Sequence, residues 1–271
     1  MPTGRFLLAA CGVNGILYAV GGYDGSFLNT LEGYDPATDT WATKAPMPTA
    51  RFGLAAGVIN GILYAVGGGN ASGFLNTIEA YDPATDTWTT KAPMPTARTL
   101  LAVGVYNGLL YAVGGRSNSG YVGTLEAYNP VTDSWTSLRS MPTPRWGLAA
   151  SFVNGKLYAA GGYNQGRRNT FEAYNPLTNR WAAKPPMPTP REDLAAGALN
   201  GRFYAIGGHS DAYETVVEAF DPATNSWITK AAMSTKREAL AAGVVGGMIY
   251  AVGGDHRRAP PLTVLEAFNP R

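Results

Sequence analysis

The stretch from Met47 to Pro93 contains four short apolar runs separated by turn residues. Two of the runs, over 51–59 and 62–66, flank Asn60-Gly61, and the fourth run begins at Trp88. Asn-Gly is a strong two-residue hairpin signal, because a type I′ turn places both central residues at positive φ. The pattern therefore predicts an antiparallel meander of four short strands.

The same pattern recurs along the whole chain. A Met-Pro or Met-Ser pair returns every 46 or 47 residues, at Met1, Met47, Met94, Met141, Met187 and Met233. One meander cannot bury both faces of its sheet, whereas six meanders arranged radially can. A period of this length indicates a repeat architecture and takes precedence over other interpretations.

Several residues hold fixed positions within each repeat. Glycine doublets occur at Gly21-Gly22, Gly67-Gly68, Gly114-Gly115, Gly161-Gly162, Gly207-Gly208 and Gly253-Gly254, and a tyrosine precedes each doublet. An aromatic residue closes each third run, and a tryptophan opens the fourth at Trp41, Trp88, Trp135, Trp181 and Trp227. This combination resembles the kelch repeat. The resemblance implies an all-β, six-bladed kelch-type β-propeller with antiparallel four-stranded blades.

The resemblance also implies that the first strand of each blade is innermost and the fourth outermost. The predicted single domain, 1–271, divides into blades 1–46, 47–93, 94–140, 141–186, 187–232 and 233–271. The sixth repeat stops before its tryptophan strand, so its blade is expected to be three-stranded, with 262–268 as an exposed edge. Either the ring tolerates this short blade or the chain was cut from a longer parent. We expect a monomer, with an edge-strand dimer through blade six as an alternative, and ring closure by side-chain packing alone.

Composition narrows the function classes. The net charge of +2 gives no electrostatic case for nucleic acid or membrane partners. No apolar run approaches the roughly 20 residues that a membrane span needs. The single cysteine, Cys11, excludes an internal disulfide framework, and the segment 1–12 matches a first strand better than a lipoprotein signal.

Two opposite charges recur in all six repeats. An arginine follows the Met-Pro-Thr segment, and a glutamate stands in the third strand. The arginines are Arg5, Arg51, Arg98, Arg145, Arg191 and Arg237, and the glutamates are Glu32, Glu79, Glu126, Glu172, Glu218 and Glu266. We expect a repeated Arg–carboxylate pair that serves the scaffold. The functional alternative is a ring of arginines that binds an anion.

The residues that differ between repeats lie in two sets of loops. These two sets share one face of the ring if the strands alternate in direction. These sets are the position after each repeat arginine and the loop after each glycine doublet, the latter including Asp255 to Arg258 in blade six. Variable loops on a rigid scaffold commonly carry specificity. The predicted ligand-binding residues are Phe6, Tyr23, Phe52, Arg116, Asn118, Trp146, Tyr163, Arg167, Glu192 and His209.

The family resemblance adds detail to this face. Peptide-binding kelch proteins use the same two loop sets, with Arg, Ser, Asn and Tyr side chains. Arg116 and Asn118 match a GG-R-x-N pattern of that kind, but the serine that some members carry after the repeat arginine is absent here. An alternative role for Phe6, Phe52 and Trp146 is to plug the mouth of the central channel.

Signatures of catalysis are weak. His209 and His256 lie in corresponding loops of adjacent blades, but two imidazoles without a third placed ligand make a poor metal site. Cys11 has no nearby histidine, and Glu192-Asp193 near Glu238 is expected to be acidic surface rather than an acid–base pair. We therefore expect no metal, no cofactor and no enzymatic activity.

The sequence favours a non-catalytic binding scaffold that presents one loop face to a protein or peptide. Exposed aromatic residues would equally suit a carbohydrate-processing enzyme that resembles the kelch-fold sialic acid mutarotases. A third interpretation is a purely structural, consensus-like propeller without a ligand, because neighbouring repeats are nearly identical. The sequence assigns neither the identity of the partner nor a cellular compartment.

Overall fold

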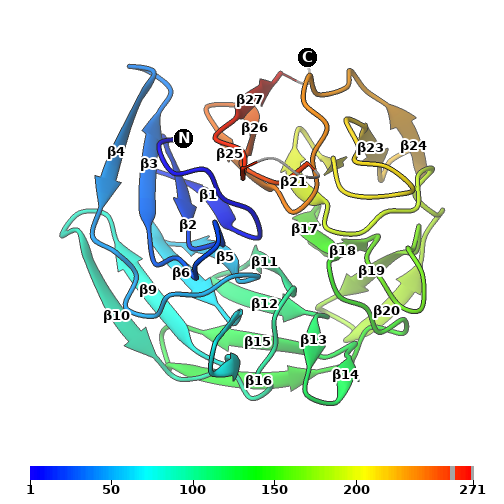
Figure 1. Ribbon diagram of the computed structural model, residues 1–271. Coiled ribbons are helices and arrows are strands. Elements are labelled where there is room, and N and C mark those ends of the chain that lie inside the picture. The colour runs from blue at the N-terminus through cyan, green and yellow to red at the C-terminus, as the bar shows by residue number, and fades with distance from the viewer. Residues whose placement is uncertain (257–259, 270–271) are drawn as a thin grey trace.

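The computed structural model describes all residues except 257–259 and 270–271. It shows an all-β ring of six sheets around a central channel, with the first and last sheets adjacent (Figure 1). The predicted six-bladed kelch-type propeller is confirmed. The part of the chain that the structure describes contains no helix able to cross a membrane.

The first three blades each contain four antiparallel strands. Blade one contains β1 (Ala9–Val13), β2 (Ile16–Val20), β3 (Leu31–Asp35) and β4 (Thr40–Lys44). Blade two contains β5 (Ala55–Ile59), β6 (Ile62–Val66), β9 (Ile78–Asp82) and β10 (Thr87–Lys91). Blade three contains β11 (Ala102–Tyr106), β12 (Leu109–Val113), β15 (Leu125–Asn129) and β16 (Ser134–Leu138).

The remaining blades follow the same order. Blade four contains β17 (Ala149–Val153), β18 (Lys156–Ala160), β19 (Phe171–Asn175) and β20 (Arg180–Ala183). Blade five contains β21 (Ala195–Leu199), β22 (Arg202–Ile206), β23 (Val217–Asp221) and β24 (Ser226–Thr229). Blade six has three strands in its described residues: β25 (Ala241–Val245), β26 (Met248–Val252) and β27 (Leu265–Phe268). β27 begins three residues later than predicted, after Pro260-Pro261.

The channel is lined by first strands, as expected for the family. β1 packs against β5 on one side and β25 on the other, and the remaining first strands continue the circle. The first strands are closely packed: a Cβ added at Gly243 would lie 2.4 Å from the Leu17 side chain. Cys11 occupies the same repeat position as Gly243, and burial raises the pKa of its thiol to about 12. This thiol is therefore protonated at neutral pH and serves as a small apolar residue.

A closed circle of backbone hydrogen bonds joins the blades above the first strands. The residues that take part all have φ between 51° and 60°: Leu7, Gly53, Leu100, Gly147, Asp193 and Ala239. Each donates its N–H to the carbonyl of its counterpart in the preceding blade, and Leu7 closes the circle by donating to Ala239 at 2.8 Å. The expectation that blade six meets blade one through side-chain packing alone is therefore wrong. Because every repeat supplies this donor and acceptor, the backbone circle is the same at the last junction as at the other five.

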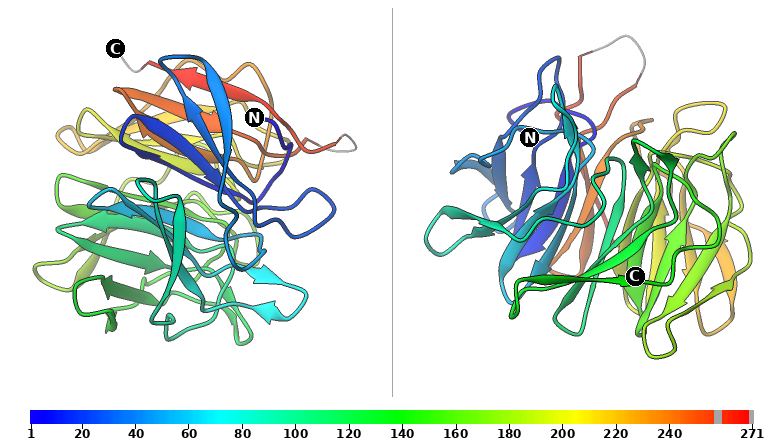
Figure 2. Two further views of the ribbon diagram at one scale, coloured as in Figure 1. Left: turned by 90° about the vertical axis from the view of Figure 1, so that its left-hand side faces the viewer. Right: turned by 90° about the horizontal axis from the view of Figure 1, so that it is seen from below.

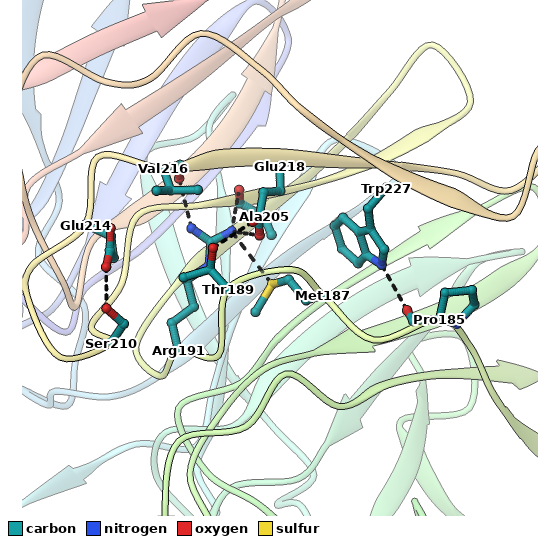
Figure 3. A network of polar contacts seen from close by, with 10 residues as sticks. All are labelled: Pro185, Met187, Thr189, Arg191, Ala205, Ser210, Glu214, Val216, Glu218 and Trp227. Atoms are coloured by element: carbon teal, nitrogen blue, oxygen red, sulfur yellow. Dashed lines mark hydrogen bonds and ion pairs between the residues drawn. The ribbon is translucent and has the colours of Figure 1, made fainter.

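The repeat arginines and glutamates form six ion pairs, as predicted, and five of them are buried on both sides, whereas Glu266 of blade six is 20% exposed. In blade five, Arg191 Nη2 lies 2.8 Å from Glu218 Oε2, and the guanidinium also donates to the carbonyls of Ala205 and Val216 (Figure 3). All six arginine side chains are fully buried, which excludes the alternative of a ring that binds anions from solvent. Burial lowers the pKa of Arg98 to about 10, so its guanidinium keeps its charge at neutral pH.

The outer-strand tryptophans join neighbouring blades. The indole Nε1 of Trp227 donates to the carbonyl of Pro185 in the preceding blade at 2.9 Å (Figure 3). Trp88, Trp135 and Trp181 make the same contact with Ala45, Ala92 and Arg139. Each of these indoles also packs beside the aromatic residue that pairs with it on the third strand.

Replacing Arg98 by alanine should lower the free energy of unfolding by about 3–5 kcal/mol. The change would leave the carboxylate of Glu126 buried without its cation, and breaking one partner of such a pair has a cost of this order. Urea denaturation would measure the loss. Arg139→Ala is the matched control, since that side chain is exposed and should change stability by no more than about 0.5 kcal/mol. Equal midpoints for the two variants would contradict the scaffold role.

Amide exchange should distinguish the edge of blade six from its junction with blade one. Backbone N–H groups in β27 that face away from β26 have no neighbouring strand in the described residues, so they should exchange faster than those of β23. β1 should be protected as well as β5, because both lie beside the hydrogen-bonded circle. Mass spectrometry of exchanged peptides would measure both. Fast exchange in β1 would contradict the closure described above.

Candidate binding face

The two predicted loop sets meet on one face of the ring. In each blade the residue after the repeat arginine pairs with the residue after the glycine doublet, as in Phe6 with Tyr23 and Trp146 with Tyr163. The other four pairs are Phe52 with Gly69, Thr99 with Arg116, Glu192 with His209 and Glu238 with Asp255. The loops after the doublets of blades one and two project to the same side, dark blue and cyan in Figure 2.

The glycine doublets hold this arrangement in place. Gly22 has φ of 107°, and its N–H donates to the carbonyl of Arg51 in the next blade at 3.0 Å. A Cβ at Gly22 would lie 2.9 Å from the carbonyl oxygen of Phe6. Glycine is required here because the conformation is left-handed and the adjacent backbone passes so close. The loop that follows is thereby fixed beside the residue after the arginine.

Blades one and two form an aromatic cleft. Phe6, Leu7, Tyr23, Phe27 and Phe52 enclose an open pocket of about 350 Å³. The ring of Tyr23 lies 5.6 Å from Phe6 and 5.5 Å from Phe27, and the rings of Phe27 and Phe52 stack at 5.7 Å. These contacts fix the orientation of the rings, so the cleft is preformed.

Blades three and four carry a second aromatic group. The ring of Trp146 lies 5.3 Å from Tyr163, and Tyr121 contacts Tyr163 edge-on at 6.1 Å. Arg116 in β13 (Arg116–Ser117) pairs with Tyr121 in β14 (Gly120–Tyr121), so an exposed arginine stands on the strand beside Tyr121. Asn118 is exposed at the tip of this hairpin.

Blades four to six carry a charged cluster. Arg167 reaches from the blade-four loop to Glu192, with its Nε 3.3 Å from Oε1, and its Nη2 lies 2.8 Å from His209 Nδ1. Glu238 Oε2 lies 3.6 Å from the same His209 nitrogen. Asp193 lines the adjoining channel mouth, a cavity of about 100 Å³ otherwise lined by leucine, glycine and alanine.

The electrostatics of this cluster disfavour ionised carboxyl groups. Burial, followed by repulsion from Glu192 and Asp255, raises the pKa of Glu238 to about 7. Burial raises the pKa of Asp193 well above its usual range, and Glu192 and Glu238 raise it further. Burial also raises the pKa of Glu192, although Arg167 opposes that shift. The cluster therefore holds protons at pH values where free carboxyl groups have lost them.

The structure groups the predicted site residues in three places. Phe6, Tyr23 and Phe52 share the aromatic cleft, Arg116 and Asn118 lie on the hairpin whose Tyr121 contacts Tyr163 beside Trp146, and Arg167 joins Glu192 and His209. The alternative that Phe6, Phe52 and Trp146 plug the channel mouth is not what the structure shows, because none of them lines that cavity.

Sequence reasoning missed two members of the face, Phe27 and Tyr121. Both close a short hairpin after the doublet, Phe27 by pairing with Tyr23 and Tyr121 by pairing with Arg116. Asp24-Gly25 is a recognised turn dipeptide and could have predicted that Phe27 returns beside Tyr23. Among the residues that the structure describes, no cluster of three or more His, Cys, Asp or Glu could hold a metal ion. Arg257 and Arg258 lie outside the described residues.

With this architecture and face established, comparison places the chain in a known class: it belongs to the kelch-repeat family. A family model for the KLHDC2/KLHL20/DRC7 kelch-repeats domain matches residues 1–162, and the kelch motif matches residues 144–188 and 190–234. A solved structure described as "Structure of YjhT" aligns with a TM-score of 0.84 and 18% identity, over 98% of this chain and 95% of that chain. At that identity the likeness concerns the fold alone. No curated protein matches the chain.

Replacing Asp193 by asparagine should stabilise the protein increasingly as pH rises from 4 to 8. The folded state keeps the Asp193 proton over a range in which the unfolded chain has lost it, so the parent loses stability as pH rises through that range. Asparagine cannot ionise, and it tolerates the left-handed conformation of this position, where φ is 51°.

Urea unfolding at pH 4, 6 and 8 would measure the difference between variant and parent. Asp24→Asn, in an exposed loop, is the control for loss of one carboxyl group. A difference between Asp193→Asn and the parent that stays constant with pH would contradict the assignment of a buried, protonated Asp193.

Proposed function

We propose that this kelch propeller is a non-catalytic binding scaffold that recognises a peptide or protein segment on its loop face. The observation that carries the proposal is the preformed aromatic cleft of Phe6, Leu7, Tyr23, Phe27 and Phe52. Its lining is aromatic or aliphatic, with the Tyr23 hydroxyl as the single polar side-chain group. Such a surface suits an apolar or aromatic anchor residue, and anchors of this kind dominate the energetics of interfaces.

The acidic residues of the face define the second requirement of the ligand. Glu192 and Glu238 lie in blades five and six, blade six adjoins blade one of the aromatic cleft, and Arg167 partly compensates the charge of Glu192. A basic group on the ligand would favour ionisation of Glu238 and would gain from its charge. The proposed ligand is therefore an extended segment with an apolar anchor and, several residues away, a lysine, an arginine or a free amino group.

Catalysis is not part of the proposal. The thiol of Cys11 is protonated at neutral pH and lies on an inner strand, so it is a poor nucleophile. Arg167 and His209 already contact the carboxyl groups of Glu192 and Glu238. Binding through rigid aromatic anchors needs none of these groups to react.

A carbohydrate-processing enzyme is the second candidate, favoured by one observation. Glu238, with its pKa raised to about 7, stands beside His209 at the channel mouth, and such a group can donate and accept protons near neutral pH. Exposed aromatic rings would stack on a sugar. Proton NMR of anomeric exchange in free sugars would test this candidate, with Glu238→Gln as the inactive variant expected if it is correct.

Peptides selected from a displayed random library should lose affinity when the face is altered. Phe52→Ala should weaken binding at least tenfold, because it removes one wall of the cleft. The triple variant Arg116→Ala, Trp146→Ala, Tyr163→Ala should abolish binding of a ligand that spans the face. Fluorescence polarisation of labelled peptides would measure both effects.

Tyr106→Ala is the control for this experiment. Tyr106 is a partly exposed aromatic residue that precedes the Asn107-Gly108 turn, at the opposite end of its strand, so peptide affinity should not change. Unchanged affinity in Phe52→Ala and in the triple variant would refute the proposed binding face.

A further inference from the structure

The four complete junctions between consecutive blades define how an outer strand is held. In blade two, Trp88 packs against a cluster that includes Val20, Leu31, Met47, Leu63 and Ala65. Its indole donates to the carbonyl of Ala45 at 2.8 Å, and Asp86 accepts the N–H of the same residue at 2.9 Å. Blade two therefore binds both the N–H and the carbonyl of Ala45, the residue that follows the outer strand of blade one.

The junction between blades five and six contains an open cavity at the corresponding place. The cavity measures about 260 Å³, and its apolar wall consists of Ile206, Val217, Met233, Ile249 and Ala251. These residues occupy the same repeat positions as the five cluster residues that pack against Trp88. Benzene occupies an engineered cavity of about 150 Å³, so this larger space can accept an indole.

Phe268 and Ala231 complete the correspondence. Phe268 lines the cavity and occupies the position of Tyr81, whose ring lies 5.2 Å from Trp88. Ala231 also lines it and occupies the position of Ala45, whose carbonyl accepts the Trp88 indole. The cavity thus presents an apolar wall, an aromatic neighbour and a backbone acceptor in the arrangement that holds a tryptophan elsewhere in the ring.

Blade one presents the matching half of this contact on the other side of blade six. Asp39 and Trp41 occupy the positions of Asp86 and Trp88, and Trp41 and Leu265 of blade six pack against the same buried clusters. Asp39 accepts the Tyr34 hydroxyl at 2.8 Å, as Asp86 accepts that of Tyr81. Within the described residues, the Trp41 indole N–H has no hydrogen-bond partner, and no backbone N–H donates to Asp39.

The edge of β27 connects these two features. Its residues are more exposed than those of the other third strands: Ala267 is exposed, whereas Ala80 and Ala219 are 5% and 0% exposed. β25 of blade six packs against β1 and β2 of blade one at this junction, and β27 is the outermost described strand of blade six (Figure 1). A strand added beside β27 would run from the cavity toward Asp39 and Trp41.

We propose that this groove docks an extended segment of another protein that carries tryptophan. The pairing of β10 with β9 sets the register: tryptophan opposite Phe268, two small or polar residues, then lysine opposite Leu265. The next residue would donate its N–H to Asp39 and accept from the Trp41 indole. The five outer strands within residues 1–271 are each paired in their own blade, so a second copy would have to open a blade to donate one, which favours a segment of another protein over a second copy.

The probe is a blocked peptide with the sequence of residues 86–93, Asp-Thr-Trp-Thr-Thr-Lys-Ala-Pro, labelled for fluorescence polarisation. It should bind saturably to the 271-residue chain, and tryptophan-to-alanine substitution in the peptide should weaken binding at least tenfold. The loop-face triple variant should bind it unchanged, which separates this groove from the proposed loop-face site. Absence of binding, or equal binding of the alanine peptide, would overturn the proposal.

Variants of the protein test whether the peptide binds beside Asp39. Asp39→Gly removes the acceptor but permits the positive φ of 56° at this position, and it should weaken binding roughly three- to tenfold, as expected for one hydrogen bond. Asp39→Asn keeps an acceptor oxygen and should bind normally, as Asn179 serves the Arg139 N–H. Asp86→Gly, at a filled junction, should not change peptide affinity. Equal affinity of Asp39→Gly and Asp39→Asn would overturn the register.

Two further measurements identify the occupant. A variant with a copy of residues 223–232, including Trp227, inserted after Pro270 should raise the melting temperature and block the peptide. Peptide binding that survives this insertion would place the peptide elsewhere and overturn the proposal. Analytical ultracentrifugation should show a monomer, whereas a concentration-dependent dimer that the insertion abolishes would assign the groove to a second copy and overturn the assignment to another protein.

Discussion

The repeat arginine is the residue on which the ring depends. Its main chain bonds to the preceding blade: Arg51 donates its N–H to Leu28 and accepts from Gly22. Its side chain is buried in its own blade, where Arg51 Nη2 lies 3.0 Å from Glu79 and donates to the carbonyl of Ala65. One residue thus fixes the sheet of one blade against the loop of another, and all six arginines bond to both blades in this way.

Such a contact has an energetic cost, because burying an ion pair removes two charged groups from water. Apolar residues of similar volume often stabilise a fold as well as a buried ion pair does, so the pair is weak evidence for stability by itself. Here the guanidinium also binds strand carbonyls, and a threonine hydroxyl binds the second oxygen of the glutamate, as Thr49 does at 2.7 Å. These directional bonds specify one position of the chain before each first strand, which an apolar contact would not do. The residue after the arginine is thereby placed next to the loop that follows the doublet, and the candidate binding face consists of these paired positions.

Much of this could be predicted from the sequence, because repetition separates scaffold from site. Asn-Gly turns, glycine doublets and the Arg–Glu pair recur in nearly every repeat, so their physical roles could be inferred without an alignment. Contacts that require two loops to return on themselves could not be inferred so directly. Phe27 and Tyr121 reach the face only because short hairpins reverse after the doublet, and Asp193 gains its environment from a channel mouth contributed by all six blades. The prediction that the ring closes by side-chain packing alone was wrong for a related reason. The circle of hydrogen bonds is made by backbone groups, which every residue has, so the pattern of side chains does not reveal it.

Nearly symmetric repeats make departures from symmetry informative. The position of Asp193 is occupied by Leu7, Gly53, Leu100, Gly147 and Ala239 in the other blades, so the backbone circle does not require a carboxyl group there. A desolvated carboxyl group that the scaffold does not need reduces stability near neutral pH. The residue after the repeat arginine likewise differs between blades: it is aromatic at Phe6, Phe52 and Trp146, and acidic at Glu192 and Glu238. Because the scaffold contacts do not require these side chains, the scaffold leaves their chemistry free, and the aromatic residues of blades one and two and the acidic residues of blades five and six give the candidate face two chemically different sides.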